Sequence, residues 1–390
     1  MPKKIAFIRT EPWPYANVRM IQVLQDAFPD HELTVLNVYN MVKAQPKIMI
    51  QNSLEVVKIY GRQILSRKKR FKRSFWRTPF IFRQMRKLIL EALMDESYVF
   101  TFQMQSLFDA SIPGIPHFLY TDHTHLANLS YPGFDRSGLY SQEWIDLEKT
   151  IYQNASRVFV WSTNVLDSVL QDYGIHSSKA VCVYPGSNAV RQDAGHGNPD
   201  RYKNKDILFV GIDWERKGGL DLLKAFKLVQ RSHPDATLTI VGSSPSVDVP
   251  NCRVVGLLPV DQVGKYFQEA SIFCLPTRLE PFGVVFVEAM LSKLPIVASN
   301  VGAIPDFLQD GVTGFLIHPG DVQGIASALS KLLADPQKCQ QFGERGYQLA
   351  QTRFSWDAVG ALIKKHILET IQKEDTDEIE QEEAFQREWL

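Results

Sequence analysis

The sequence predicts an α/β protein with two doubly wound parallel sheets, each forming a Rossmann-like domain. Short apolar runs typical of buried strands alternate with longer amphipathic runs typical of helices, and this alternation occurs twice along the chain. A length of 390 residues is more than one hydrophobic core usually supports. Between the two series, residues 191–205 lack apolar periodicity and are polar, as linkers are. We therefore expect two domains joined by a linker, with a ligand-binding cleft between them.

The predicted domain boundaries follow from where each series begins and ends. The second domain covers 206–355, and 356–390 hold a crossover C-terminal helix, helical to about residue 370, and an acidic tail. Amphipathic helices of the first domain include 142–154 and 163–173, and Gly174 is placed to end the second of them. The first domain covers 1–190, with strands expected at 5–8, 33–38, 98–102, 117–120, 157–161 and 180–183.

Composition excludes several classes of protein. The 43 lysines and arginines are balanced by 43 acids, so no global positive field points to nucleic acid. The four cysteines form no CxxC pair, which favours reduced thiols over disulfides or a zinc site. No apolar run reaches the roughly 18 residues needed to span a bilayer, and the apolar run at 5–8 is too short for a signal peptide. A cytoplasmic protein is expected.

Two glutamates eight positions apart mark the candidate functional site. Glu280 follows a buried strand expected at 271–276, and open α/β sheets bind ligands at the carboxyl ends of their strands. Pro281 suits the first turn of the apolar helix expected at 283–292, whose free N–H groups attract an anion such as phosphate. Glu288 lies one turn deeper among apolar residues, where a carboxylate is costly unless it is hydrogen-bonded. Either glutamate alone fits a solvated position, but their combined arrangement favours a binding site.

This arrangement resembles the E-x7-E signature of the retaining, nucleotide-sugar-dependent glycosyltransferases of family 4, which have the GT-B fold. The resemblance implies a hexosyltransferase that moves a sugar from a nucleotide-diphosphate donor to an acceptor hydroxyl and retains the anomeric configuration. It extends from about Lys205 to Trp356. The segments that carry it, in the family's order, are 207–211, Arg216-Lys217-Gly218, 238–242, 292–298, 302–305 and 310–315.

Arg216 and Lys217 are the candidate phosphate-binding residues. They follow a strand and precede a helix, so they lie at the strand's carboxyl end. Cations at the start of a helix oppose its dipole, which favours an anionic ligand over two solvated charges. A nucleoside diphosphate leaving group needs such positive charge while the C–O bond breaks. The resemblance implies that both residues hold the pyrophosphate and take part in catalysis.

The resemblance also implies the remaining donor contacts. Glu280 would accept hydrogen bonds from hydroxyls of the transferred sugar, and Glu288 from the ribose diol. The amides of Phe282 and Gly283 would face the pyrophosphate from the other side. Two further positions would line the donor site: Gly211, which ends the first strand of the second domain, and Leu258, whose backbone would face the base.

No metal and no other cofactor is expected, since the donor, expected to be a UDP-sugar, is a substrate. Glycosyltransferases of the other large fold hold a divalent cation with an Asp-x-Asp motif. The one such triplet here, Asp375-Thr-Asp377, lies in the charged tail with no strand near it. Arg216 and Lys217 are expected to supply the positive charge instead.

In the first domain, a polar segment follows the strand expected at 117–120. Polar residues at the carboxyl end of a strand face the cleft in sheets of this kind. Members of the family place a histidine after this strand, next to the donor sugar. His123 fits that position best, with Asp122 beside it as a substrate-binding residue and His125 as the second choice. An ordinary surface turn is the alternative.

Residues 58–87 carry twelve Lys or Arg and no acid. Bases mixed with aromatic residues are typical of segments that lie on anionic lipid. One alternative is a solvated helix face paired with the tail at 369–388, which has nine acids against two bases. Nucleic acid is the other, and the neutral overall charge disfavours it. We expect an anionic membrane surface and a peripheral location at its cytoplasmic face. The interleaved aromatics are Phe71, Phe75, Trp76, Phe80 and Phe82.

The expected function is that of a metal-independent, retaining glycosyltransferase whose acceptor is a membrane lipid or a lipid-linked glycan. One alternative is transfer to a soluble small molecule or polysaccharide. Another is an epimerase or phosphorylase of the same fold, although such phosphorylases are far longer and carry a pyridoxal-phosphate lysine site with no counterpart here. The family's Gly-rich loop after the first strand is replaced by residues 10–16, so acceptor handling is expected to differ.

Overall fold

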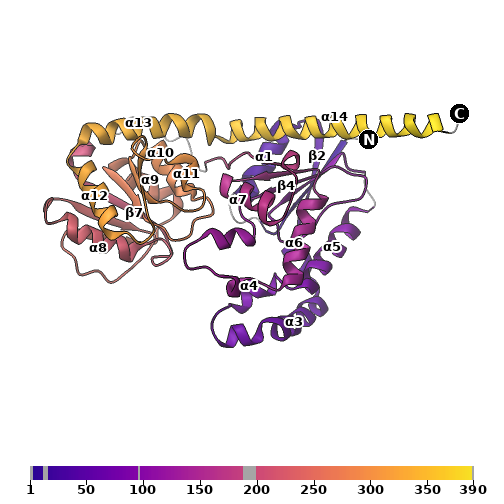
Figure 1. Ribbon diagram of the computed structural model, residues 1–390, viewed down its shortest axis with the longest axis horizontal. Helices are drawn as coiled ribbons and strands as arrows, with labels where there is room; N and C mark the ends of the chain where they lie inside the picture. Colours follow the sequence, from indigo (N-terminus) through magenta and orange to yellow (C-terminus); the bar gives the residue numbers. More distant parts are fainter. Residues whose placement is uncertain (1–2, 12–15, 95–96, 188–198, 389–390) are drawn as a thin grey trace. The chain divides into compact units, whose positions relative to one another are not determined.

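The structure, a computed structural model, describes the chain except for residues 1–2, 12–15, 95–96, 188–198 and 389–390 and the side chains of 375 and 377–388. The chain forms two compact units, and each contains one sheet with helices packed on it (Figure 1). The first unit consists of 1–129, 134–185 and 356–390, and the second of 130–133 and 186–355.

The first unit is built on a six-stranded sheet in which every strand runs parallel to its neighbours, as predicted. The spatial order is β2-β1-β3-β4-β5-β6, so the winding direction reverses between β1 and β3. The strand predicted at 98–102 lies two residues later, because its pairing with β4 continues to Met104. The strands are β1 (Lys3–Arg9), β2 (His31–Asn37), β3 (Phe100–Met104), β4 (His117–Thr121), β5 (Arg157–Val160) and β6 (Ala180–Cys182).

The last helix returns to the first unit, where α14 packs against α1 and β5. Its predicted end near residue 370 is wrong. The helix continues to Glu388 because the acidic tail contains no glycine or proline and is rich in strong helix formers. The α-helices of this unit are α1 (Ala16–Ala27), α2 (Val38–Lys43), α3 (Pro46–Leu65), α4 (Phe71–Phe75), α5 (Pro79–Leu93), α6 (Gln142–Asn154), α7 (Thr163–Asp167), extended by a π-helical turn (Ser168–Asp172), and α14 (Trp356–Glu388).

The second unit is also built on six parallel strands, in the order β12-β11-β10-β7-β8-β9. Its strands are β7 (Asp206–Val210), β8 (Thr237–Val241), β9 (Cys252–Gly256), β10 (Ile272–Leu275), β11 (Ile296–Ser299) and β12 (Gly314–Ile317). Its helices are α8 (Gly219–Val229), α9 (Val260–Glu269), α10 (Val284–Leu291), α11 (Ile304–Phe307), α12 (Val322–Leu333) and α13 (Pro336–Arg353).

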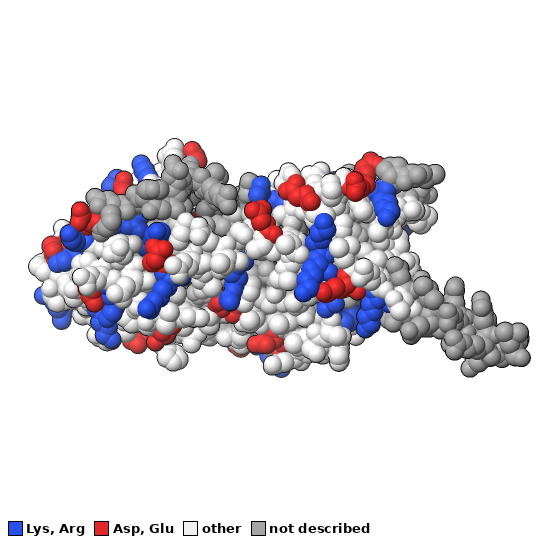
Figure 2. All heavy atoms as spheres, turned by 90° about the horizontal axis from the view of Figure 1, so that it is seen from above, with Lys and Arg blue, Asp and Glu red and all other residues white. Residues whose placement is uncertain are grey.

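The inner strands β3, β4, β10 and β11 are buried on both faces, as the strands of parallel sheets are. In the first unit, Phe7 stacks on Phe102 at 6.1 Å between ring centroids, and Phe159 stacks on Phe102 at 6.3 Å and on Phe118 at 6.1 Å. All four cysteines are free thiols. No helix within the described ranges is long and apolar enough to cross a bilayer. On the face seen in Figure 2, positive and negative side chains are interspersed, in keeping with the balanced composition.

Candidate active site

The order of strands in the second unit places the two halves of the predicted donor site side by side. β7 and β10 are neighbours in the sheet, and the winding direction reverses between them. Open α/β sheets bind ligands at the carboxyl ends of their strands at such a switch point. Lys217 lies in the loop after β7, and Glu280 lies in the loop after β10.

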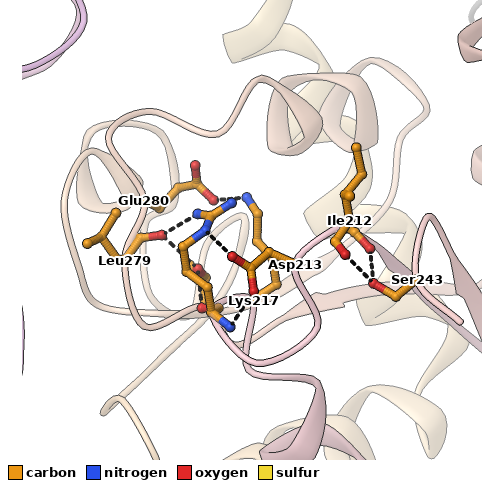
Figure 3. Close-up of polar contacts among 9 residues, drawn as sticks. Ile212, Asp213, Lys217, Ser243, Leu279 and Glu280 are labelled. Carbon is orange, nitrogen blue, oxygen red and sulfur yellow. Dashed lines mark hydrogen bonds and ion pairs between the residues drawn. The ribbon is translucent and has the colours of Figure 1, made fainter. Parts of the chain in front are cut away.

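Lys217 and Glu280 form an ion pair across this switch point. The Lys217 ammonium donates to the Glu280 carboxylate, and the two side chains point toward each other in Figure 3. Their side chains are only 11% and 7% exposed. Burial lowers the pKa of Lys217, and the Glu280 carboxylate opposes that shift. The pair is therefore a nearly desolvated charge cluster where a ligand is expected.

Arg216 ties the two loops together and keeps part of its guanidinium in solvent. Its Nη1 donates to the carbonyl of Leu279 at 2.8 Å, and its Nε lies 3.4 Å from a carboxylate oxygen of Asp213 (Figure 3). Its own carbonyl accepts from the amide of Arg278 at 2.8 Å. The arginine side chain is 36% exposed, so it can reach an anion without breaking a buried contact.

Two glycines permit the close approach of these loops. Gly218 has a φ of +76°, and a Cβ there would overlap the carbonyl oxygen of Pro276. Gly302 has a φ of +55°, and a Cβ there would overlap the carbonyl oxygen of Glu280 and lie 2.8 Å from the Tyr131 hydroxyl. Tyr131 belongs to the 130–133 stretch that joins the second unit. Tyr131 was not among the predicted site residues, because nothing in its local sequence singles it out.

The helix α10 begins one residue later than predicted. Gly283 is its N-cap, with a left-handed φ of 86°, so the prediction that Pro281 lies in the first turn is wrong. The glycine turn, rather than the proline, sets the start of the helix. The Phe282 ring is buried against Phe307 and Phe354, at 5.6 and 5.8 Å between centroids. The backbone amides of Phe282 and Gly283 are therefore the groups left for a phosphate, which stays a prediction.

The Glu288 side chain has the features of a residue that binds a ligand. It lies on α10 with Val287 and Ala289, both buried, on either side of it in the chain. Burial raises its pKa to about 7. Among the residues that the structure describes, none hydrogen-bonds its carboxyl group or forms an ion pair with it. A half-buried carboxyl group without a protein partner is suited to accept hydrogen bonds from hydroxyls that arrive with a substrate.

Gly211 and Leu258 lie at the carboxyl ends of β7 and β9. The Gly211 amide donates to the carbonyl of Val241 at 2.9 Å. Its carbonyl accepts from the Ser243 hydroxyl, which also donates to the carbonyl of Ile212 at 3.1 Å (Figure 3). Leu258 is half-buried in the turn between β9 and α9. The backbone of both residues thus lies at the strand ends that border the switch point. Their contact with the base of the nucleotide stays a prediction.

The first unit has its own polar cluster at its switch point between β1 and β3. The Thr10 hydroxyl donates to the Gln105 side chain at 2.7 Å, which joins the ends of the two strands. Gln105 adopts a φ of 69°, a conformation that residues other than glycine seldom adopt. The loop at 10–16 was among the predicted features of the site, but Gln105 was not. Its position directly after a buried strand was the signal available.

His123 and Asp122 follow β4, as predicted. The His123 carbonyl accepts from the hydroxyls of Thr121 at 2.9 Å and Ser106 at 3.1 Å, so the backbone of this loop is fixed. The His123 ring is half-buried, and burial lowers its pKa below the ordinary value. Burial raises the pKa of Asp122. The imidazole is therefore neutral at neutral pH, and its contact with a sugar stays a prediction.

His125, the second choice, is committed to the protein. Its Nε2 accepts from the amide of Tyr140 at 2.9 Å, and its ring packs edge-on against Trp144 at 5.2 Å. Burial lowers the pKa of His125 to about 3. With its acceptor nitrogen occupied and its proton affinity this low, His125 supports the loop rather than a substrate.

The backbone of this loop is also held by a buried glutamate that was not among the predicted site residues. Glu148, on α6, is 2% exposed and accepts from the amide of His125 at 3.0 Å. The hydroxyls of Tyr152, at 3.2 Å, and Tyr173 also donate to it. Burial raises the pKa of Glu148 to about 7 despite these donors. In the sequence, Glu148 was one of several charges on an amphipathic helix.

Replacing Glu148 with glutamine is expected to change how stability depends on pH. The folded-state pKa of Glu148 lies above its ordinary value, so its contribution is full below about pH 4.5 and is lost as pH rises through 7. The free energy of unfolding of the parent should fall by roughly 3 kcal/mol relative to Glu148→Gln over that interval. Urea titrations at pH 4.5 and 7.5 measure it. A difference that is flat or rises with pH contradicts the buried neutral carboxyl.

The fold divides the basic segment 58–87 into paired and unpaired residues. Lys69 is buried and donates to the carbonyls of Gly138 and Leu139 at 2.7 and 2.9 Å. Four other bases pair with acids of the first unit: Lys58 with Glu55, Arg83 with Glu143, Arg86 with Asp109 and Lys87 with Glu91.

The aromatic residues of the same segment point mostly inward. Phe75 and Phe82 are buried, and Trp76 stacks on Tyr39 at 3.7 Å. The expectation that the aromatics of this segment lie on lipid is wrong for Phe75 and Phe82, because the apolar faces of α4 and α5 pack on the core of the first unit. Phe71 is 41% exposed.

Comparison with known proteins relates the second unit to a family of glycosyltransferases. The family model for glycosyl transferases group 1 matches residues 194–349. A glycogen synthase of Mycobacterium tuberculosis is 27% identical over 234 residues, which are 57% of this chain and 56% of that protein. The chain thus matches about half the length of that relative. A GDP-mannose-dependent phosphatidylinositol monomannoside mannosyltransferase of Mycolicibacterium smegmatis is 29% identical over 166 residues, 38% of this chain and 44% of that protein.

Solved structures confirm the predicted fold. The structure of Anabaena HepE in complex with UDP and glucose aligns with a TM-score of 0.62 at 17% identity, covering 94% of this chain and 99% of that one. At this identity the likeness speaks for the fold alone. Together with the two parallel six-stranded sheets, it shows the GT-B fold of two Rossmann-like units.

Proposed function

Because the chain carries a glycosyl transferases group 1 domain over residues 194–349, we propose that it is a retaining glycosyltransferase. It moves a hexose from a nucleoside diphosphate sugar to an acceptor hydroxyl. The observation that carries this proposal is the charged pair of Lys217 and Glu280 at the β7–β10 switch point, with the unpartnered Glu288 on the following helix.

The site can meet each part of such a donor. Arg216 and Lys217 offer two cations to the pyrophosphate, and positive charge there stabilises the leaving group as the C–O bond breaks. When the phosphate of the donor replaces Glu280 as the partner of Lys217, the Glu280 carboxylate can accept hydrogen bonds from hydroxyls of the sugar. Glu288 can accept from the ribose diol. We propose that the two cations do without a metal ion and that UDP is the nucleotide, as in the HepE complex.

Calorimetry with UDP, GDP and ADP in the presence of a chelator tests the donor site. We expect the three nucleoside diphosphates to differ in affinity, with UDP binding most tightly, and we expect binding to persist without divalent cations. Binding that strictly requires magnesium would contradict metal independence, and failure to bind any nucleoside diphosphate would contradict the proposed function.

Replacing Glu288 with glutamine is expected to remove a pH dependence from UDP binding. The free carboxyl has a pKa raised to about 7, and its ionised form accepts hydrogen bonds from ribose hydroxyls more strongly than its protonated form. Below pH 7 the group must lose its proton to reach the stronger form, so this residue alone should make binding up to about tenfold weaker at pH 6 than at pH 8. UDP itself titrates in this range, so the quantity measured is the difference between the parent and Glu288→Gln. Equal pH profiles for the two proteins would remove Glu288 from the ribose site.

The stereochemical outcome separates retention from inversion. In the mechanism usually drawn for this family, a leaving phosphate oxygen takes the acceptor proton on the face from which the nucleotide departs, so no protein nucleophile is needed. Proton NMR of freshly formed product from an α-linked donor should show an α linkage. A β-linked product is incompatible with the proposed mechanism.

We propose a membrane lipid or a lipid-linked glycan as acceptor, at the cytoplasmic face of a membrane. The similarity to the mannosyltransferase that acts on a phosphatidylinositol monomannoside supports this choice. The similarity to glycogen synthase supports a second candidate, transfer to a soluble polysaccharide. Assays that offer extracted lipids and soluble glycans in parallel, with a radiolabelled donor, distinguish the two.

A further inference from the structure

The helix α3 has apolar residues on both of its faces. The face that packs against the rest of the first unit carries Asn52, Val56 and Tyr60, all buried. The opposite face is exposed and also apolar. Its residues are spaced so that they form one stripe along the helix. They are Ile50, Leu54, Val57 and Leu65, with exposed fractions of 64%, 66%, 61% and 86%.

Unpaired bases surround the end of this stripe. Within residues 46–75 the only acid is Glu55, which is half-buried and lies 3.6 Å from Lys58. Phe71, at the start of α4, adds a partly exposed ring. Six exposed bases form no ion pair with an acid of the described chain: Arg62, Arg67, Lys68, Arg70, Lys72 and Arg73. We call the stripe, Phe71 and these six bases the α3–α4 face.

We propose that the α3–α4 face docks on the surface of an anionic lipid bilayer. The apolar stripe would enter the boundary between headgroups and acyl chains, and the bases would contact the headgroups. A second copy of the chain is a poorer partner, because a two-fold contact through this face would bring the same unpaired positive charges together. An anionic surface with an apolar interior satisfies both halves of the face at once.

The contacts of α3 and α4 within the first unit connect the α3–α4 face to the loop after β4. They belong to the segment between β2 and α5. The Tyr60 hydroxyl accepts from the amide of Ser141 at 3.3 Å, and the Lys69 ammonium lies 4.5 Å from the centre of the Tyr140 ring. Tyr140 in turn donates its amide to His125. Tyr60, Lys69 and Tyr140 thus connect the segment that carries the docking face to His125 in the loop after β4. If the proposed function holds, docking would bring lipid-borne hydroxyls to the unit that carries that loop.

Flotation of the full-length chain with vesicles tests the proposal. The chain should float with equal parts of phosphatidylglycerol and phosphatidylcholine at low salt, and far less with phosphatidylcholine alone. The double variant Leu54→Ser/Val57→Ser should lower the partition coefficient at least about tenfold. The triple variant Arg67→Ser/Lys68→Ser/Arg70→Ser should lower it on the order of 10²-fold at low salt and reduce its salt dependence. Lys69 is left intact because it is buried and bonded to two carbonyls.

Matched controls change the same residue types elsewhere. Met94→Ser removes an apolar side chain that is 76% exposed at the end of α5, and Lys224→Ser/Lys227→Ser removes two exposed bases from α8. Both should float like the parent. The proposal is overturned if the α3–α4 variants also float like the parent, or if Leu54→Ser/Val57→Ser turns a dimer into a monomer by light scattering and leaves flotation unchanged. UDP affinity, measured on the same samples, reports on the proposed function alone, so the two can fail separately.

Discussion

Replacing His123 with alanine is expected to lower the turnover number by about 10²–10⁴, the scale of one positioned catalytic group. The physical reason is the state of its ring. Burial lowers the pKa of His123, so the imidazole is neutral at neutral pH and can accept a hydrogen bond from a sugar hydroxyl. A neutral ring does not repel the positive charge that develops on the sugar as the nucleotide leaves.

The geometry of the loop allows the effect of the His123 ring to be measured without loss of the backbone contacts. The backbone at His123 is fixed by the hydroxyls of Thr121 and Ser106, which bond its carbonyl rather than its ring, so the alanine variant keeps these contacts. Initial rates and UDP affinity are measured together, since the loss should appear in turnover and not in nucleotide binding. His176→Ala, at an exposed position, is the matched control. If the His123→Ala variant turns over within tenfold of the parent rate, His123 has no catalytic role and the loop is an ordinary surface turn.

Replacing Lys217 with alanine is expected to weaken UDP binding by roughly 1.5–3 kcal/mol and to destabilise the second unit as well. The first effect is the loss of a charge-assisted hydrogen bond to phosphate. The second arises because Glu280 would be left buried without its partner, and breaking a buried ion pair in this way costs about 3–5 kcal/mol. Calorimetry and thermal unfolding measure the two effects on one protein.

Two companion variants separate these effects. Arg216→Ala should weaken UDP binding by a similar amount with little loss of stability, because its side chain is 36% exposed. Lys217→Met/Glu280→Gln should regain much of the stability that Lys217→Ala loses, because no unpaired buried charge remains, but it should not regain affinity. If Lys217→Ala unfolds more easily yet binds UDP like the parent, the ion pair is structural and the phosphate assignment is wrong.

The sequence alone determined the features that depend on short stretches of chain. The strand before Glu280, the apolar helix carrying Glu288 and the alternation that yields two parallel sheets follow from local periodicity, and the structure confirms them. Local pattern failed where a glycine turn competed with a proline at the start of α10 and where the acidic tail continued as helix.

Only the tertiary structure decided which distant residues meet and which faces stay exposed. Lys217 and Glu280 are 63 positions apart, and they pair because the sheet order sets β10 beside β7. On α3, Val56 is buried and Val57 is exposed, although both are valines on a helix with apolar residues on each side. The periodicity of such a helix does not say which side packs inward. That choice depends on the shape of the unit that the helix covers, because apolar burial is favourable on either face and only one face can meet the core.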